Sequence, residues 1–206
     1  MNKPLPTHFE GSFDNLYGNF GARFSAMLLD GLILSPMVLI TIILNSKNLS
    51  NYYISFAVTT VVSLVYYLYL PVKYGATPGK QLMNLQILKI DGSAITYKDA
   101  FQRYLPAFVL SLIALFVTAV AISRADAEVY NNLKWLNQSK YLSSFNSVMF
   151  YSEIGLTYIY LFSNLIIFLI NPRKRSISDF SGNTVVVYKT QLGKIEDFKN
   201  NNTKVN

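Results

Sequence analysis

Residues 24–44 read FSAMLLDGLILSPMVLITIIL, an apolar run that carries a single charged residue, Asp30. The hydrocarbon core of a bilayer is about 30 Å thick, and a helix needs about 20 mostly apolar residues to cross it. The run has this length and composition, so it predicts a transmembrane helix. Glu10 and Asp14 lie where the apolar core of a cleavable signal peptide would begin, so we expect the helix to remain in the protein as an anchor.

Three further apolar runs follow, so we expect four transmembrane helices, at about residues 24–44, 52–71, 104–123 and 152–171. The runs are continuous and do not alternate with polar residues, which indicates helices and not the strands of a barrel. Charged residues make up only 14% of the chain, against about 25% in a soluble domain. The predicted fold class is an all-α membrane protein, a four-transmembrane-helix bundle with a small cytoplasmic α/β element.

The distribution of Lys and Arg between the connections predicts the orientation in the membrane. With four spans, the two termini and the connection at residues 71–103 share one side. Of the 18 Lys and Arg residues, only four fall on the opposite side: Lys47, Arg124, Lys134 and Lys140. We therefore expect a multi-pass protein of a bacterial cell membrane (the inner or plasma membrane) with cytoplasmic N and C termini.

The chain has a net charge of +7, and its basic residues lie next to the apolar runs. A basic chain can bind nucleic acid, but this placement favours anionic lipid headgroups on the cytoplasmic leaflet, so no nucleic-acid partner is expected. Four spans are few for a transporter. A transport pathway would therefore need a homo-oligomer or a second membrane protein as partner.

The cytoplasmic connection is expected to be structured. Thr77 and Pro78 are typical of the cap and the first residue of a helix. Short strands are expected at 85–90, 94–96 and 184–188, and together they could form one sheet. At the two ends of the chain we expect polar cytoplasmic tails. The domain boundaries are then 1–20 for the N-terminal tail, 21–190 for the transmembrane domain and 191–206 for a disordered C-terminal tail.

Asp30 is the most informative single residue. A charged carboxylate at this depth costs about 2.5–3.5 kcal/mol on insertion scales, so it must be paired, protonated or exposed to a wet cavity. Arg23 is two helical turns away, about 10 Å at 1.5 Å per residue, which is too far for a pair within one regular helix. Pro36 weakens the same helix, and a carboxylate beside a weakened helix can bind a cation or a proton. The alternative is that Asp30 pairs internally and locks the helices together.

Other polar residues favour structural interpretations. Asp179 follows a basic cluster at 173–175, where a solvated carboxylate that neutralises the arginines is expected. Glu153 suits the start of a helix, and Asn164 suits a bond between helices. The chain has no Cys, and its single His8 lies in the polar tail, so no metal or cofactor is expected. No pair of catalytic residues stands out, and we expect no enzyme activity.

Three segments together resemble the RDD family of membrane proteins, named for one arginine and two aspartates. They are GARFSAMLLDG at 21–31, TPGKQL, ILKIDG and FQRY within 77–104, and SDFSGNTVVV at 178–187. The resemblance implies that Arg23, Asp30 and Asp179 are the naming residues. The family often has His before the last aspartate, whereas this chain has Ser178, which weakens a proton relay at that end. The long connection at 124–149 matches no part of the family pattern that we recognise.

The resemblance also implies a role in transport, since sodium–proton exchange is proposed for some members of the family. The first hypothesis is therefore exchange of a small monovalent cation for protons. Asp30 would bind the ion or proton, and Arg23, Asp179 and Arg103 would form a charge network at the cytoplasmic side. The alternative is a non-transporting accessory or assembly subunit in which the Arg/Asp/Asp set is structural.

Overall fold

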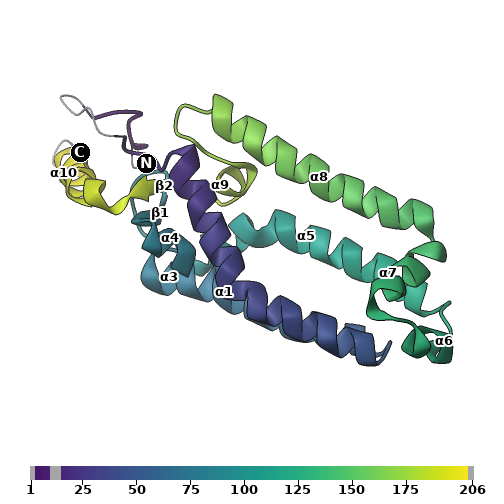
Figure 1. The fold of residues 1–206 in the computed structure, drawn as a ribbon. Helices are drawn as coiled ribbons and strands as arrows, with labels where there is room; N and C mark the ends of the chain where they lie inside the picture. The colour runs from purple at the N-terminus through teal and green to yellow at the C-terminus, as the bar shows by residue number, and fades with distance from the viewer. Residues whose placement is uncertain (1–2, 10–14, 204–206) are drawn as a thin grey trace. The chain divides into compact units, whose positions relative to one another are not determined.

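The computed structural model describes residues 3–9 and 15–203 (Figure 1), so Glu10, Asp14 and Lys204 lie outside the described residues. The protein is mostly helical. Four helices are long and apolar enough to cross a membrane: Phe20–Lys47 (α1), Asn51–Tyr74, Tyr97–Ile122 (α5) and Ser147–Ile170 (α8). Each coincides with one of the apolar runs in the sequence to within a few residues, so the prediction of four apolar helices is confirmed.

The second apolar helix changes its winding part-way along. It comprises α2 (Asn51–Leu64), a π-helical turn η1 (Val65–Tyr69) and α3 (Leu70–Tyr74). Pro71 explains the change, because its ring nitrogen cannot donate a hydrogen bond and its ring crowds the preceding turn. Widening that turn to π geometry relieves the conflict. The helix ends at Gly75, whose φ of +79° closes it in a left-handed conformation.

The chain forms two compact units. The first comprises Met1–Ile33, Leu64–Pro106 and Ser163–Asn206, and the second comprises Leu34–Ser63 and Ala107–Phe162. The first unit therefore contains both tails, the 71–103 connection and the adjoining ends of the apolar helices. The second contains the remaining helical segments and the 124–149 connection.

A two-stranded antiparallel sheet lies in the first unit. Strand β1 (Leu85–Lys89) pairs with β2 (Thr184–Tyr188), with Leu85 opposite Tyr188, which confirms the strands expected at 85–90 and 184–188. The return strand expected at 94–96 is wrong, since only Ala94 forms an isolated bridge, to Leu88. Only Ile95 and Thr96 separate Ala94 from α5, so the chain leaves the sheet before a strand can form.

Both faces of this sheet are covered, which is why apolar side chains occur on both faces of its strands. Leu88, Val185 and Val187 face one cluster, together with Leu5 and Ile195. Leu85, Ile87 and Val186 face the other, together with Ala26 and Ala100. The alternation follows the two-residue period of a strand. Part of the N-terminal segment expected as a polar tail is therefore packed: Leu5 is buried and its N–H donates to the carbonyl of Ile90 at 2.8 Å.

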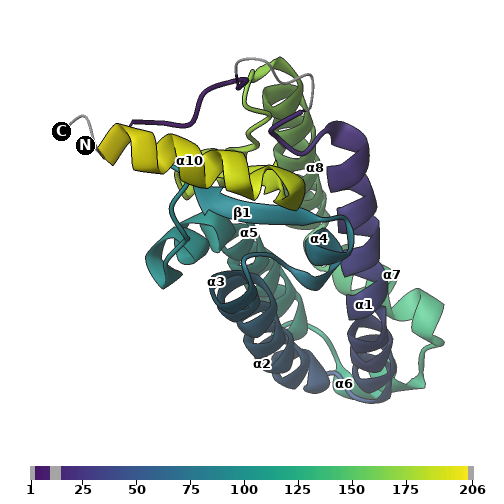
Figure 2. The same ribbon diagram turned by 90° about the vertical axis from the view of Figure 1, so that its left-hand side faces the viewer.

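The C-terminal segment differs from the disordered tail expected at 191–206. After a short 3₁₀ turn η2 (Lys189–Gln191), residues Leu192–Thr203 form helix α10, which lies along the sheet in Figure 2. Leu192, Ile195 and Phe198 recur every three residues, and all three pack in the cluster with Leu5. This spacing places them on one helical face, and their burial offsets the cost of ordering a polar segment.

Short helices complete the fold. In the first unit these are α4 (Pro78–Leu82) and α9 (Ile177–Ser181). In the second unit the 124–149 connection forms α6 (Ala127–Asn132) and α7 (Trp135–Ser144). The side chain of Asp126 accepts bonds from the N–H groups of Glu128 and Val129 and so caps α6. Tyr130 of α6 is fully buried in a cluster with Leu49 and Leu142.

Replacing Ile195 with Ala should lower the stability of the protein. The side chain is 2% exposed, and truncating a buried Ile to Ala costs about 2–5 kcal/mol. Glu196→Ala is the matched control, because Glu196 is exposed on the next position of α10. Thermal unfolding of the purified protein in detergent would measure both variants. Equal melting temperatures for the two would contradict the packing of α10 on the sheet.

Candidate functional site

Asp30 lies in α1 and is 4% exposed. Its Oδ1 atom accepts two hydrogen bonds, from the phenol of Tyr66 at 2.5 Å and from the backbone N–H of Gly79 at 2.7 Å. Its Oδ2 atom accepts from the hydroxyl of Thr77 at 2.7 Å and from the ammonium of Lys80 at 3.5 Å. Four donors therefore surround one carboxylate, and three of them come from the start of α4.

Thr77 was expected to cap α4 with its side chain, but it does not. Thr77 occupies the cap position, with φ −66° and ψ 156°, but its side chain makes no capping bond to the helix. Its hydroxyl donates to Asp30 instead, and Asp30 accepts the Gly79 N–H that a capping side chain would have bound. Asp30 thus caps α4 from another helix, and the N-terminus of α4 supplies partial positive charge to the carboxylate.

Gly79 allows this approach. A Cβ atom at this position would lie 2.3 Å from the carbonyl oxygen of Ala26, 2.6 Å from Oδ1 of Asp30 and 2.7 Å from the Asp30 nitrogen. Two of these atoms belong to the backbone of α1, which cannot move aside as a flexible side chain can. Only glycine fits where α4 touches α1.

Lys80 is the charged partner of Asp30. Burial lowers the pKa of its ammonium from the ordinary value, and the negative charge of Asp30 partly offsets that effect. The same ammonium donates to the Thr77 hydroxyl at 3.2 Å. The pair is therefore a charge-assisted bond inside a polar cluster that also includes two hydroxyl groups.

Asp179 forms a second centre. It lies in α9, is fully buried, and accepts from Arg23 of α1 at 2.6 Å between Nη1 and Oδ2. Arg103 of α5 donates to the other carboxylate oxygen. The N–H of Ser176 also donates to Oδ2, and the Ser176 hydroxyl accepts the N–H of Asp179, which completes a capping box at the start of α9.

The prediction that Asp179 is solvated is wrong, because the arginines that it neutralises fold over it. Arg175 is itself 7% exposed: its Nε donates to the carbonyl of Thr184 and its Nη2 to that of Asp179, both at 3.0 Å. Its guanidinium also stacks over the ring of Phe180, 4.0 Å from the centroid. This part of the basic cluster is therefore structural and is not presented to lipid headgroups.

The arginines decide the ionisation of Asp179. Burial alone would raise the pKa of its carboxyl, but the charges of Arg103 and Arg23 and the hydrogen bond from Ser176 more than offset that effect. The pKa of Asp179 is therefore well below its ordinary value, and the residue is a carboxylate at any physiological pH.

The structure brings Arg23, Arg103 and Asp179 together and places Asp30 in the separate cluster at α4. As the spacing predicts, no bond joins Arg23 and Asp30 among the described residues. The partners that the sequence did not identify are Tyr66, Gly79 and Lys80 for Asp30, and Arg175, Ser176 and Thr184 around Asp179. The helix start predicted at Thr77 and Pro78 was a signal for Gly79 and Lys80. Nothing in the sequence distinguishes Tyr66 from the other tyrosines of its apolar run.

The remaining candidates lie outside these clusters. The Oδ1 atom of Asn164 accepts the N–H of Ile177 at 3.2 Å and so fixes the start of α9. Glu153 accepts a bond from Thr157 one turn along its own helix. His8 is exposed. Within residues 3–9 and 15–203, no group of three His, Asp or Glu side chains could hold a metal ion.

The order of these contacts along the chain is that of the RDD pattern, with the arginine and first aspartate in α1 and the second aspartate in α9. The sequence model of the RDD family matches residues 17–183. The chain belongs to the RDD family. The matched region of this RDD protein contains both carboxylates and their charged partners and ends just before β2. No curated protein and no solved structure matches the chain.

Replacing Gly79 with Ala should destabilise the RDD protein by about 1–3 kcal/mol, because the added methyl group must push α4 away from α1. Gly31→Ala is the matched control. Gly31 follows Asp30 in α1, and a Cβ there meets nothing within 4 Å, so its stability should stay the same or rise slightly. Thermal unfolding in detergent measures the difference. A Gly79→Ala variant as stable as Gly31→Ala would rule out the close contact.

Asp179→Asn should cost about 3–5 kcal/mol near neutral pH, because it leaves buried guanidiniums without their counter-charge. A lowered folded-state pKa stabilises the protein above the pKa of the unfolded state, about 3.9 for Asp, and this stabilisation is lost as the pH falls below it. The stability gap to the wild type should therefore be constant from about pH 5 to 8 and narrow below about pH 4. Chemical unfolding across this range tests it, with the exposed Asp197→Asn as control. A stability difference between the wild type and Asp179→Asn that stays constant down to pH 2 would contradict the lowered pKa of Asp179.

Proposed function

We propose that this RDD protein is a non-transporting accessory or assembly subunit of the cell membrane, in which the Arg/Asp/Asp set fastens apolar helices to the small α/β element. The observation that carries the proposal is the complete occupation of Asp30. Both oxygens accept two donors each. A cation at this carboxylate would face the hydrogens of three polar groups and the charge of Lys80, all of which repel it.

The second centre supports the same reading. Asp179 is enclosed by two guanidiniums and by the capping box of its own helix. Its low pKa keeps it from exchanging protons near neutral pH. A carboxylate that stays enclosed and ionised is suited to holding segments together. It is poorly suited to a transport cycle, in which the binding group must change its exposure or its protonation.

The orientation proposed for this subunit has both termini in the cytoplasm. The N-terminal segment, the 71–103 connection and the C-terminal helix all belong to the first unit, which supports their sharing one side of the membrane. The excess of Lys and Arg on these segments favours the cytoplasmic side. The surface lysines there would contact anionic headgroups and a partner membrane protein.

A second candidate is exchange of a monovalent cation for protons at Asp30. One observation favours it: Tyr66, which donates to Asp30, lies in the π-helical turn η1, and such turns occur frequently at functional sites. A return of this turn to α-helical winding would rotate Tyr66 away from Asp30 and open one oxygen. Lys80, whose pKa is lowered by burial, would then be the group that gives up a proton.

Proteoliposomes with an internal pH dye separate the two functions. Under a sodium or potassium gradient, the accessory function predicts no pH change beyond that of empty vesicles, for the wild type and for Asp30→Asn alike. It also predicts that Asp30→Asn lowers the melting temperature, because the new amide N–H₂ opposes Thr77 and Lys80 and leaves a buried charge unpaired, at a cost of about 3–5 kcal/mol.

A known antiporter reconstituted in the same vesicles shows that the assay works, and Asp197→Asn controls for removal of an exposed carboxylate. A cation-dependent pH change in the wild type, lost in a stably folded Asp30→Asn variant, would overturn the accessory function and establish exchange at Asp30.

A further inference from the structure

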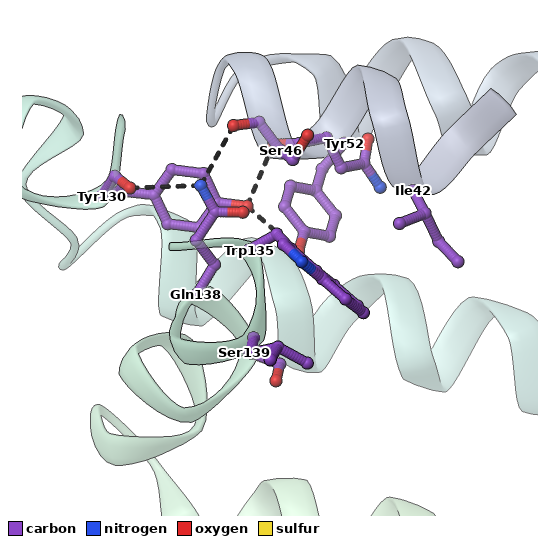
Figure 3. Close-up of a pocket in the computed structure, with 9 residues that line it drawn as sticks. Ile42, Ser46, Tyr52, Tyr130, Trp135, Gln138 and Ser139 are labelled. Atoms are coloured by element: carbon purple, nitrogen blue, oxygen red, sulfur yellow. Dashed lines mark hydrogen bonds between the residues drawn. The ribbon is translucent and has the colours of Figure 1, made fainter. Parts of the chain in front are cut away.

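A pocket of about 250 Å³ lies in the second unit, independent of the carboxylate clusters (Figure 3). The end of α1, the start of α2 and the helices α6 and α7 line it, and it is open on one side, where Trp135 is exposed. The residues that matter for its chemistry are Asn45, Tyr52, Tyr130, Trp135, Gln138 and Ser139. Its volume is just below the range of about 300–1,000 Å³ typical of drug-sized ligands, so a ligand of a single ring fits.

The wall of the pocket is held by buried polar bonds. The phenol of Tyr130 donates to the carbonyl of Asn45 at 3.0 Å. The amide nitrogen of Gln138 donates to the carbonyls of Ser46 at 3.0 Å and Tyr130 at 3.3 Å, as the dashed lines in Figure 3 show. Gln138 and Tyr130 are both buried. These bonds fix the positions of Tyr130 and Gln138 in the pocket wall without a ligand.

Other polar groups at the pocket make no hydrogen bond to any described residue. Within the part of the chain that the structure describes, no group bonds to the amide nitrogen of Asn45, the indole N–H of Trp135, the amide oxygen of Gln138 or the hydroxyl of Ser139. The bonds that Gln138 already makes through its nitrogen fix the orientation of its amide, so its oxygen is the acceptor left over. The pocket thus offers donors and an acceptor on several sides.

None of the nine described residues that line the pocket is charged. A charged ligand would gain no counter-charge here, which favours a neutral ligand over an anion or a cation of the same size. Tyr52 and Trp135 both line the pocket, and aromatic faces pack well against the C–H face of a saturated ring. The ligand should therefore be neutral, cyclic and rich in hydroxyl groups.

We propose that this pocket binds one neutral sugar ring or a similar cyclic polyol. The ring packs on Trp135, and its hydroxyls bond to the free amide groups of Asn45 and Gln138 and to Ser139. The same chemistry is presented by a free monosaccharide and by the headgroup of a neutral glycolipid. The proposal does not depend on the function assigned to the Arg/Asp/Asp set.

Trp135 makes the test direct, because it is the single tryptophan of the chain and its emission reports on this pocket alone. The full-length protein is placed in phosphatidylcholine nanodiscs free of sugar detergents and titrated with glucose, galactose and myo-inositol. A saturable change in emission is expected for at least one of them, with a Kd of about 1 mM or below. Glucuronate and glucosamine, of equal ring size but charged, should bind at least tenfold more weakly.

Ser139→Phe fills the pocket from its exposed rim and should abolish the emission change. Asn137→Phe is the matched control, since Asn137 is exposed on the same helix and does not line the pocket. Both variants should keep the wild-type melting temperature, and a Ser139→Ala variant tests loss of the hydroxyl alone, with an expected weakening of two- to tenfold.

Nanodiscs that contain a monoglucosyl diacylglycerol distinguish the source of the ring. A response to free sugars identifies a soluble ligand, and a response only to the glycolipid identifies a lipid headgroup. The proposal is overturned if neither probe changes the emission, if the charged sugars bind as well as the neutral ones, or if Ser139→Phe responds like Asn137→Phe.

Discussion

The buried carboxylate of Asp179 is the interaction on which the first unit depends. A fully buried carboxylate is stable only if charged partners and hydrogen bonds replace its water. Those partners come from two apolar helices, Arg23 from α1 and Arg103 from α5. Neither helix can shift without exposing an unpaired charge, so Asp179 fixes where both meet α9. The next segment after α9 is β2, whose position in the sheet is set by the same anchor.

In the same unit, Asp30 supplies the acceptor that the start of α4 lacks. A helix N-terminus has N–H groups without partners, and α4 has no side-chain cap of its own. A carboxylate in an apolar helix lacks donors. Joining the two satisfies both, and Gly79 provides the space for it. The two aspartates therefore act alike: each places polar ends of short helices against apolar helices, at points where water would otherwise be required.

The sequence predicts features that follow from local rules. Apolar length predicts the four helices, and short segments rich in aliphatic residues predict β1 and β2. It does not predict Tyr66 as a partner of Asp30, because the side of the helix that Tyr66 faces depends on a π-helical turn induced by Pro71. It also does not predict α10. Gly193 and charged residues lie between Leu192, Ile195 and Phe198, and their spacing indicates a buried face only once a sheet is present for the helix to cover. The burial of Arg175 likewise depends on Thr184, which is distant until the strand forms.

The carboxylate clusters differ from the pocket mainly in whether their polar groups already have hydrogen-bond partners, and less in the residue types that they contain. At Asp30 and Asp179 the oxygens are filled by donors of the chain itself, so a ligand there must first break bonds that hold helices together. In the pocket of the second unit, the bonds that hold the wall use one side of each group, the nitrogen of Gln138 and the oxygen of Asn45, and leave the other side open. A ligand can enter such a site without any structural cost to the protein. We therefore expect ligand recognition in the 124–149 connection and structural integrity in the Arg/Asp/Asp set that names the family.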